Sequence, residues 1–255
     1  MVRNILLTIE YDGTGFHGWQ RQPEVRTVQG VLEEALSRVC ATPITIDGVS
    51  RTDAGVHALG QRATFSGDFG IPADRIPIAV NGLLSGTDRE GDLRIIESRQ
   101  VPSGFHARFD ARGKKYRYMI RNEESMAVFL RNYRYQVPET LDLDLMRTAA
   151  SYIVGEHDFA CFQAAGGTPR ETTVRTVTSL DIFQAGEAGS RDISIEIAGD
   201  GFLYNMVRII TGTLVEVGRG KITPEQMINI LDSHDRGQAG HTAPPQGLYL
   251  VEVYY

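Results

Sequence analysis

Cysteine is scarce in this sequence, which contains two among its 255 residues, Cys40 and Cys161. They lie far apart and outside any C-x-x-C pattern, and the histidines show no metal-ligand spacing with them. A disulfide framework is therefore excluded and no metal site is indicated. Reduced core thiols in a cytoplasmic protein are the expectation.

Long hydrophobic runs are also missing, since no apolar stretch approaches the ~18 residues of a membrane span. The opening residues, MVRNILLTIEYDG, lack a signal peptide's order of basic, apolar and small segments. We therefore expect no membrane partner. With 42% hydrophobic residues, the chain can bury a proper core in one large domain or two small ones.

Positive charge is in deficit overall, because the net charge is −6, which argues weakly against a polyanionic partner. Residues 104–121, GFHARFDARGKKYRYMIR, depart from this balance with six basic residues and one acidic residue. The basic residues are Arg108, Arg112, Lys114, Lys115, Arg117 and Arg121, and the interleaved aromatic residues are Phe105, Phe109, Tyr116 and Tyr118. A solvated charged strand would explain the charges alone. The aromatic residues favour an RNA-facing surface, because bases stack on rings while cations hold phosphates.

Three glycines, Gly13, Gly15 and Gly18, form a G-x-G-x-x-G pattern after the apolar residues 5–9. A dinucleotide-binding turn needs a helix that opens within the glycines. Here the glycines run into WQRQP, and no helix is signalled before Thr27. A plain loop is favoured, with a dinucleotide-dependent oxidoreductase as an alternative that cofactor titration would test.

The first half of the chain predicts the order βαββαβ, which is typical of a ferredoxin-like, mainly antiparallel sheet with helices on one face. Hydrophobic periodicity predicts strands over residues 2–11, 44–46, 61–65 and 93–98, and helices over residues 28–39 and 72–84. Thr27 is the expected N-cap of the first helix.

The second half repeats this pattern loosely. It predicts strands over residues 115–120, 174–183, 192–197 and 248–254, and helices over residues 141–153 and 202–217. A capping box at residues 223–226 opens a further short helix. We therefore expect an α+β protein of two ferredoxin-like lobes, residues 1–101 and 102–255, with a central RNA-binding cleft.

The segment of residues 48–58, GVSRTDAGVHA, contains residue types that are typical of a catalytic site. Asp53 followed by Gly55 could be only a turn, but a turn leaves Arg51 and His57 unexplained. An arginine near Asp53 would keep its carboxylate ionised, and an ionised loop carboxylate is a good nucleophile or base. For His57, a hydrogen-bonded loop histidine is the simpler interpretation, with a proton shuttle as the alternative.

RTDAGVHA resembles the catalytic signature of the TruA family, the tRNA pseudouridine synthases A. The resemblance extends along the whole chain in the family's order, through YDGTGFHGWQRQ, TVQGVLEEAL, FHARFDARGKKYRY, HDFACF, TTVRTV, GFLYNMVRIITGTLVEVGRGK and TAPPQGLYLVEVYY. It implies that the glycines belong to a loop near an RNA site. The chief departure from the family is the overall acidity.

The resemblance implies isomerisation of uridine to pseudouridine at positions 38, 39 and 40 of tRNA, in the anticodon stem-loop. It also implies a homodimer. The reaction is an internal rearrangement and needs no cofactor. A non-catalytic RNA-binding module of the same fold is the alternative from another functional class.

By the same resemblance Asp53 is the catalytic carboxylate, which either attacks C1′ of the sugar or removes a C2′ proton to form a glycal. Tyr116 matches the tyrosine that stacks on the target base, although strand alternation puts Tyr118 on the same face. Leu203 is expected to pack near the flipped base. Arg208 interrupts an apolar series, and we prefer a partly buried pair with Asp53 over a snorkelling side chain.

Further residues are expected to contact the RNA: Arg51 at the substrate, and Arg21, Arg108, Arg112, Lys114 and Lys115 at its backbone.

Overall fold

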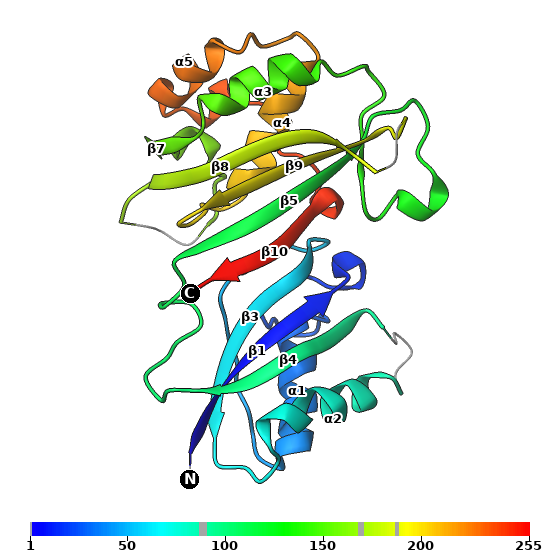
Figure 1. The fold of residues 1–255 in the computed structure, drawn as a ribbon, viewed down its shortest axis with the longest axis vertical. Coiled ribbons are helices and arrows are strands. Elements are labelled where there is room, and N and C mark those ends of the chain that lie inside the picture. The colour runs from blue at the N-terminus through cyan, green and yellow to red at the C-terminus, as the bar shows by residue number, and fades with distance from the viewer. Residues whose placement is uncertain (1, 87–90, 168–170, 187–188) are drawn as a thin grey trace. The chain divides into compact units, whose positions relative to one another are not determined.

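The computed structural model describes residues 2–86, 91–167, 171–186 and 189–255 (Figure 1). It consists of two compact units, the first formed by residues 1–112 and 249–255 and the second by residues 113–248. Residues 102–112, which the sequence assigned to the second lobe, thus belong to the first unit, as does most of the last strand. Short 3-10 helices accompany the main elements, at Gly13–Gly15, Ala73–Arg75, Val128–Leu130, Ala160–Phe162, Arg236–Gln238 and Pro245–Gly247.

The first unit has the predicted βαββαβ order. Its elements are β1 (Arg3–Tyr11), α1 (Val28–Cys40), β2 (Asp47–Gly48), β3 (His57–Gly67), α2 (Ile76–Leu84) and β4 (Leu93–Val101). Strand β1 pairs antiparallel with both β3 and β4, and β2 pairs antiparallel with β3, which gives the order β4-β1-β3-β2. The final strand β10 (Leu248–Tyr254) adds to β3 in parallel. Helices α1 and α2 pack together on one side of this sheet (Figure 1).

Helix α1 begins where the sequence predicts. The Thr27 side chain accepts a hydrogen bond from the Gly30 N–H, which satisfies one of the donors left open in a first helical turn. Leu32 and Leu36 lie one turn apart, and both are completely buried. The helix therefore presents a continuous apolar stripe to the core of the first unit.

Two predicted elements of the first unit differ from the structure. Residues 44–46 form no strand, because side chains of α1 take their backbone donors: Ser37 accepts from Ile44 N–H at 2.8 Å and Glu33 accepts from Ile46 N–H at 3.1 Å. The ladder starts only at Asp47. Residues 73–75 form a 3-10 turn, and α2 begins at Ile76 with a proline in its first turn, where a missing N–H is tolerated.

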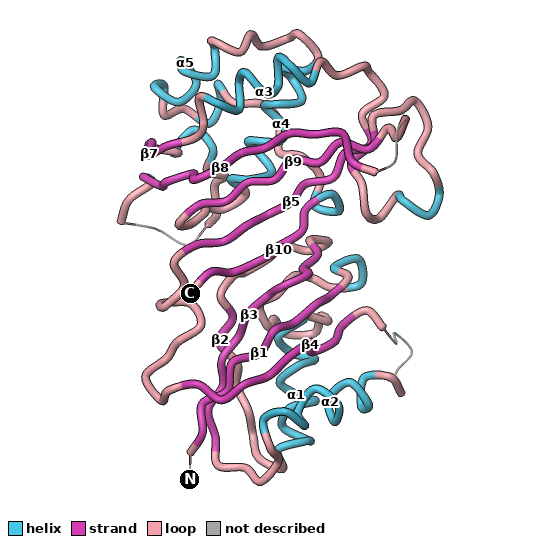
Figure 2. The backbone as a smooth tube through the Cα atoms, viewed as in Figure 1, coloured by secondary structure: helices cyan, strands magenta, loops and turns pink. Residues whose placement is uncertain are grey.

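The strands of the second unit are also paired mainly antiparallel (Figure 2). Its elements are β5 (Gly113–Arg121), β6 (Tyr135–Gln136), α3 (Leu143–Ser151), β7 (Gly155–Asp158), β8 (Val174–Ala185), β9 (Asp192–Gly199), α4 (Met206–Gly218) and α5 (Gln226–Ser233). The strands follow the order β5-β9-β8-β7, and β6 pairs in parallel with β5. When β6 and β7 are left out, the succession β5-α3-β8-β9-α4 repeats β1-α1-β2-β3-α2 of the first unit. The α+β class with mainly antiparallel sheets is confirmed.

Helix α4 begins later than predicted, at Met206 rather than at residue 202. Asn205 has a left-handed backbone with φ of 60°, a conformation that asparagine tolerates better than most residues but that cannot continue a right-handed helix. The turn before it closes with a hydrogen bond from Met206 N–H to the Leu203 carbonyl at 3.1 Å. This turn separates Leu203 from the helix that carries Arg208.

Candidate active site

Asp53 lies on the loop between β2 and β3, and hydrogen bonds hold the backbone on both sides of it. The Thr52 carbonyl accepts from the Trp19 N–H at 3.0 Å, and the Asp53 carbonyl accepts from the Val56 N–H at 3.2 Å. Thr52 is buried, whereas Asp53 is half-buried. The structure thus offers a partly accessible carboxylate on a well-anchored loop, which suits a nucleophile or base.

The glycine triplet at residues 13–18 packs against this loop. A Cβ on Gly13 would lie 2.1 Å from the Val56 carbonyl oxygen, and a Cβ on Gly18 would lie 2.7 Å from the Thr52 carbonyl oxygen. Gly18 also has φ of +87°, which side chains disfavour. Because α1 starts only at Val28, the geometry of a dinucleotide turn does not form. The glycines instead allow two backbones to approach closely.

His57 is hydrogen-bonded, as expected, but it is the first residue of β3 and not a loop residue. It is 2% exposed and stacks on Tyr249 with ring centroids 4.8 Å apart. Its Nδ1 accepts from the Gly13 N–H at 3.0 Å and lies 3.2 Å from an Asp12 carboxylate oxygen. The ring therefore ties β3 to the glycine loop.

The two arginines predicted near this loop are both exposed. The predicted interaction of Arg51 with Asp53 stays a prediction. Arg21 pairs with the buried Glu33 at 3.0 Å while its own side chain stays 64% exposed. Both remain predicted RNA contacts.

In the second unit, β5 places Tyr116 and Tyr118 on the same buried face, as strand alternation predicts. Tyr116 lies opposite Ile197 and Tyr118 lies opposite Ile195 on β9. The Tyr118 hydroxyl donates to the Pro244 carbonyl at 2.6 Å, and burial raises the pKa of Tyr118 well above its usual value. Tyr116 makes an edge contact with Phe202, with ring centroids 5.2 Å apart. Both tyrosines are buried, and the choice of Tyr116 as the functional tyrosine stays a prediction.

Arg208 is half-buried on α4, and the structure orients its guanidinium group. Nε donates to the Ala243 carbonyl at 2.8 Å, and Nη1 donates to the Asn205 side-chain oxygen at 2.8 Å. Leu203, the other predicted residue of this region, is 5% exposed. The predicted pairing of Arg208 with Asp53 joins residues of different units and stays a prediction.

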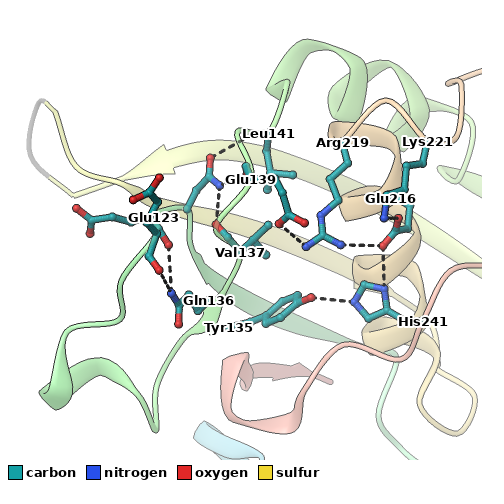
Figure 3. A network of polar contacts seen from close by, with 12 residues as sticks. Glu123, Tyr135, Gln136, Val137, Glu139, Leu141, Glu216, Arg219, Lys221 and His241 are labelled. Atoms are coloured by element: carbon teal, nitrogen blue, oxygen red, sulfur yellow. Dashed lines mark hydrogen bonds and ion pairs between the residues drawn. The ribbon is translucent and has the colours of Figure 1, made fainter.

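A polar network that the sequence did not reveal holds the segment leading to Ala243 (Figure 3). His241 bonds to the Tyr135 hydroxyl at 3.0 Å and lies 3.3 Å from a Glu216 carboxylate oxygen. Burial acts to raise the pKa of Glu216, but the neighbouring Lys221, Arg219 and His241 outweigh it and lower the pKa. No local motif signals this network, because its members come from distant segments.

The same segment lies directly against α4. A Cβ on Gly212 would sit 1.8 Å from the His241 carbonyl oxygen, and Ala243 N–H donates to the Arg208 carbonyl at 3.0 Å. Only a glycine fits at position 212, which brings the Ala243 carbonyl within reach of the Arg208 side chain. The network and this contact together orient Arg208.

The positive charges of residues 104–121 are neutralised by acidic side chains to a greater extent than the sequence suggests. On β5, Lys115 and Arg117 both pair with Glu196, the latter at 2.8 Å. Burial acts to raise the pKa of Glu196, but these two cations outweigh it and lower the pKa. Arg121 pairs with Glu123 at 2.6 Å and with Asp192 at 3.3 Å. The acidic partners other than Glu123 come from β9, so counting charges within residues 104–121 could not find them.

At the start of this segment, Arg112 is exposed and the Arg108 guanidinium lies 5.6 Å from the Phe109 ring centroid. Phe109 is itself 75% exposed. Lys114 is half-buried. An exposed ring beside a cation is the pairing expected of a surface that binds unstacked bases and phosphates.

Across the residues that the structure describes, no group of His, Cys, Asp and Glu could hold a metal ion. In the same residues no helix is both long and apolar enough to cross a membrane.

Comparison with known proteins gives a consistent result along the whole chain. A family model described as tRNA pseudouridine synthase matches residues 7–110 and 149–255. The tRNA pseudouridine synthase A of Acetivibrio thermocellus is 48% identical over 254 residues, which covers 100% of both chains. That of Caldicellulosiruptor bescii is 46% identical over 254 residues, again with 100% of both chains covered.

One solved structure, an H/ACA RNP bound to a substrate RNA containing 2′-deoxyuridine, is 10% identical with a TM-score of 0.33. The match covers 85% of this chain and 53% of that chain. A similarity this low carries no argument about the fold.

Proposed function

Because the chain belongs to the tRNA pseudouridine synthase family, we propose that it modifies the anticodon stem-loop of tRNA with Asp53 as its catalytic carboxylate. The chain is an isomerase that converts uridine to pseudouridine in tRNA. Positions 38, 39 and 40 are the proposed targets. The structure of its loop supports the proposed role of Asp53, because this half-buried residue extends from a backbone that hydrogen bonds to Trp19 and Val56 hold in place.

The reaction breaks the bond between N1 of uracil and C1′ of the ribose and forms a bond between C5 and C1′. C5 loses its proton and N1 gains one, so the atoms balance without any oxidant, reductant or group donor. Asp53 acts either by attack at C1′ or by removal of a C2′ proton. Both routes require the carboxylate to be ionised and held close to the sugar.

Tyr116 is the proposed partner of the target base. A ring on a strand is held rigidly, and base stacking on an aromatic side chain is worth about 1–3 kcal/mol. Leu203 and Arg208 are proposed to bind the same nucleotide. Arg51, Arg21, Arg108, Arg112, Lys114 and Lys115 are proposed to contact the RNA chain.

We also propose that the protein is a homodimer in the cytoplasm, where its tRNA substrate is found. The family resemblance supports the dimer, and the scarcity of cysteine is consistent with a reducing compartment.

Release of tritium from tRNA labelled at C5 of uridine tests the activity directly, because C5 must lose its hydrogen once for each pseudouridine formed. Primer extension after carbodiimide treatment then maps the modified positions. We expect release in proportion to pseudouridine at positions 38, 39 and 40. Binding of tRNA without any release would instead support a non-catalytic RNA-binding module.

A further inference from the structure

A series of buried, hydrogen-bonded polar side chains connects the sheet of the first unit to the residue before Asp53. Gln61 on β3 is completely buried, Tyr11 at the end of β1 is 3% exposed, and Thr52 is 8% exposed. Their hydrogen bonds connect the two central strands to the loop that carries Asp53. Buried polar groups of this kind are costly unless each is bonded, so their partners are strongly constrained.

Gln61 is the first residue in this series of hydrogen bonds. Its Oε1 accepts the N–H groups of Ser50 at 3.3 Å and of Arg62 at 3.2 Å. Its Nε2 donates to the Ser50 carbonyl at 2.8 Å, which fixes the orientation of the amide group. The second Nε2 hydrogen is directed at the Tyr11 hydroxyl oxygen, 3.5 Å away.

The Tyr11 hydroxyl accepts from Gln61 and forms a hydrogen bond with the Thr52 hydroxyl. Its oxygen lies 2.7 Å from Thr52 Oγ1. Thr52 is then held at two points, at its side chain by Tyr11 and at its carbonyl by Trp19 N–H at 3.0 Å. The peptide that joins Thr52 to Asp53 has little freedom left, and the Asp53 side chain extends directly from it.

We propose that Tyr11 is a positioning residue for pseudouridine formation, and that its buried hydroxyl fixes Thr52 and thereby the direction of the Asp53 carboxylate. This inference rests on the proposed function, because it takes Asp53 as the catalytic group. A displacement of a reacting group by about 1 Å can cost about 100-fold in rate. A single hydroxyl can therefore matter to the rate without touching the substrate.

Tyr11 also has a packing role, which the experiment must separate from positioning. Its ring packs against Phe16 and Trp19, with centroid distances of 6.3 Å in each case. A phenylalanine would keep these contacts and lose the hydrogen bond to Thr52. Tyr11→Phe is therefore the informative substitution.

A matched control is available in the same unit. The Tyr255 hydroxyl donates to the Ala107 carbonyl at 3.1 Å, away from the Asp53 loop. Tyr255→Phe removes one tyrosine hydroxyl and one hydrogen bond, as Tyr11→Phe does. The two variants differ in whether the lost bond reaches the loop of Asp53.

Single-turnover rates, tRNA dissociation constants and thermal unfolding are measured for wild type, Tyr11→Phe and Tyr255→Phe. We expect Tyr11→Phe to lose about 10- to 100-fold in rate with tRNA affinity within about two-fold, and Tyr255→Phe to retain the wild-type rate. A Tyr11→Phe variant that reacts at the wild-type rate, whatever its melting temperature, overturns the proposal.

Thr52 provides a second test that does not depend on the folding of the Tyr11 variant. Thr52→Val should lose as much rate as Tyr11→Phe, Thr52→Ser should recover most of it, and the double variant Tyr11→Phe/Thr52→Val should be no slower than Thr52→Val. Losses that multiply in the double variant would show independent roles and overturn the proposal. If wild type itself forms no pseudouridine, the proposed function fails first, and this inference fails with it.

Discussion

Asp53 is the residue on which the proposed chemistry depends, and replacing it should separate catalysis from binding. Phosphate contacts and base stacking are distributed over other residues, so Asp53→Asn and Asp53→Ala should abolish pseudouridine formation and keep tRNA affinity within a few-fold. Tritium release and filter binding measure the two quantities. Substantial turnover by a pure Asn variant, free of deamidated protein, would contradict the assignment.

Tyr116 and Tyr118 can be distinguished by removing one hydroxyl at a time. Tyr116→Phe should bind RNA nearly normally, because stacking needs only the ring, and should lose most of its turnover, because C5 must lose a proton. Tyr118→Phe removes the hydrogen bond to Pro244 and should lower stability more than turnover. Full activity of Tyr116→Phe together with an inactive Tyr118→Phe would reverse the assignment.

The sequence points to single residues where a short motif contains them, and it does not reveal a contact that joins distant segments. Asp53 was assigned through the resemblance of RTDAGVHA to the family's signature, and its catalytic role stays a prediction. The bond from Tyr11 to Thr52 spans 41 positions, and the pairing of Lys115 with Glu196 depends on the register between β5 and β9. Neither could be predicted from local patterns, because strand register is a property of the whole sheet.

At the scale of elements, periodicity predicted the strands and helices that bury a continuous face, and it failed where a side chain competes with the backbone. The first helix was predicted with its cap at Thr27. The strand predicted over residues 44–46 is absent because Ser37 and Glu33 take its backbone donors. The start of α4 was missed because the left-handed Asn205 interrupts an otherwise helical pattern.

Strand β5 is the element expected to carry phosphate contacts, and its contribution can be measured through salt. Replacing Lys114 and Lys115 with Ala should weaken tRNA binding and flatten the dependence of log K on log salt by roughly 0.7 to 0.9 per lost contact. The product should not change. The Lys115 contribution is expected to be smaller, since its ammonium group already pairs with Glu196.

Lys221→Ala is the control for this experiment, because that lysine pairs with Glu216 near the end of α4, in the network of Figure 3. It removes one positive charge, as each of the two β5 substitutions does, and should leave the salt slope unchanged. An unchanged slope in the Lys114/Lys115 variant as well would place the RNA surface elsewhere, with Arg21 as the first residue to test.

At the scale of the whole molecule, buried acids predict a loss of stability in alkali. Burial raises the pKa of Tyr255 from its usual 10 to about 12, and burial raises the pKa of Cys161 from 9 to about 12. Both groups are neutral when protonated, and folding favours that form. Their stabilising contribution is present below the usual pKa values and is lost as the pH rises toward about 12.

The free energy of unfolding, measured with urea at a series of pH values above about 9, should therefore decrease. Tyr255→Phe should make this decrease shallower, because it removes one of the titrating groups. A steeper or identical slope in that variant would show that Tyr255 does not contribute to the alkaline transition.

A chain with net charge −6 must still bind an RNA substrate. A carboxylate cannot reach C1′ while the uridine is stacked in the anticodon stem, so the nucleotide has to turn out of the helix. Unstacking costs a few kcal/mol, and least where pairing is already weak. Local phosphate contacts and stacking on Tyr116 would offset the cost of unstacking, whereas the acidic residues elsewhere in the chain do not offset it.

Substrates with a loosened stem end should therefore react faster than those with a strengthened one. Single-turnover rates are compared for anticodon stem-loops that differ only in the base opposite the target uridine. We expect the unpaired target to react faster than the A-paired target, and we expect the Tyr116→Ala variant to react more slowly with both, because it has lost the stacking that stabilises the flipped base. If the unpaired target reacts no faster in wild type, flipping does not limit the rate and this energetic argument fails, although Asp53 could still be the catalytic carboxylate.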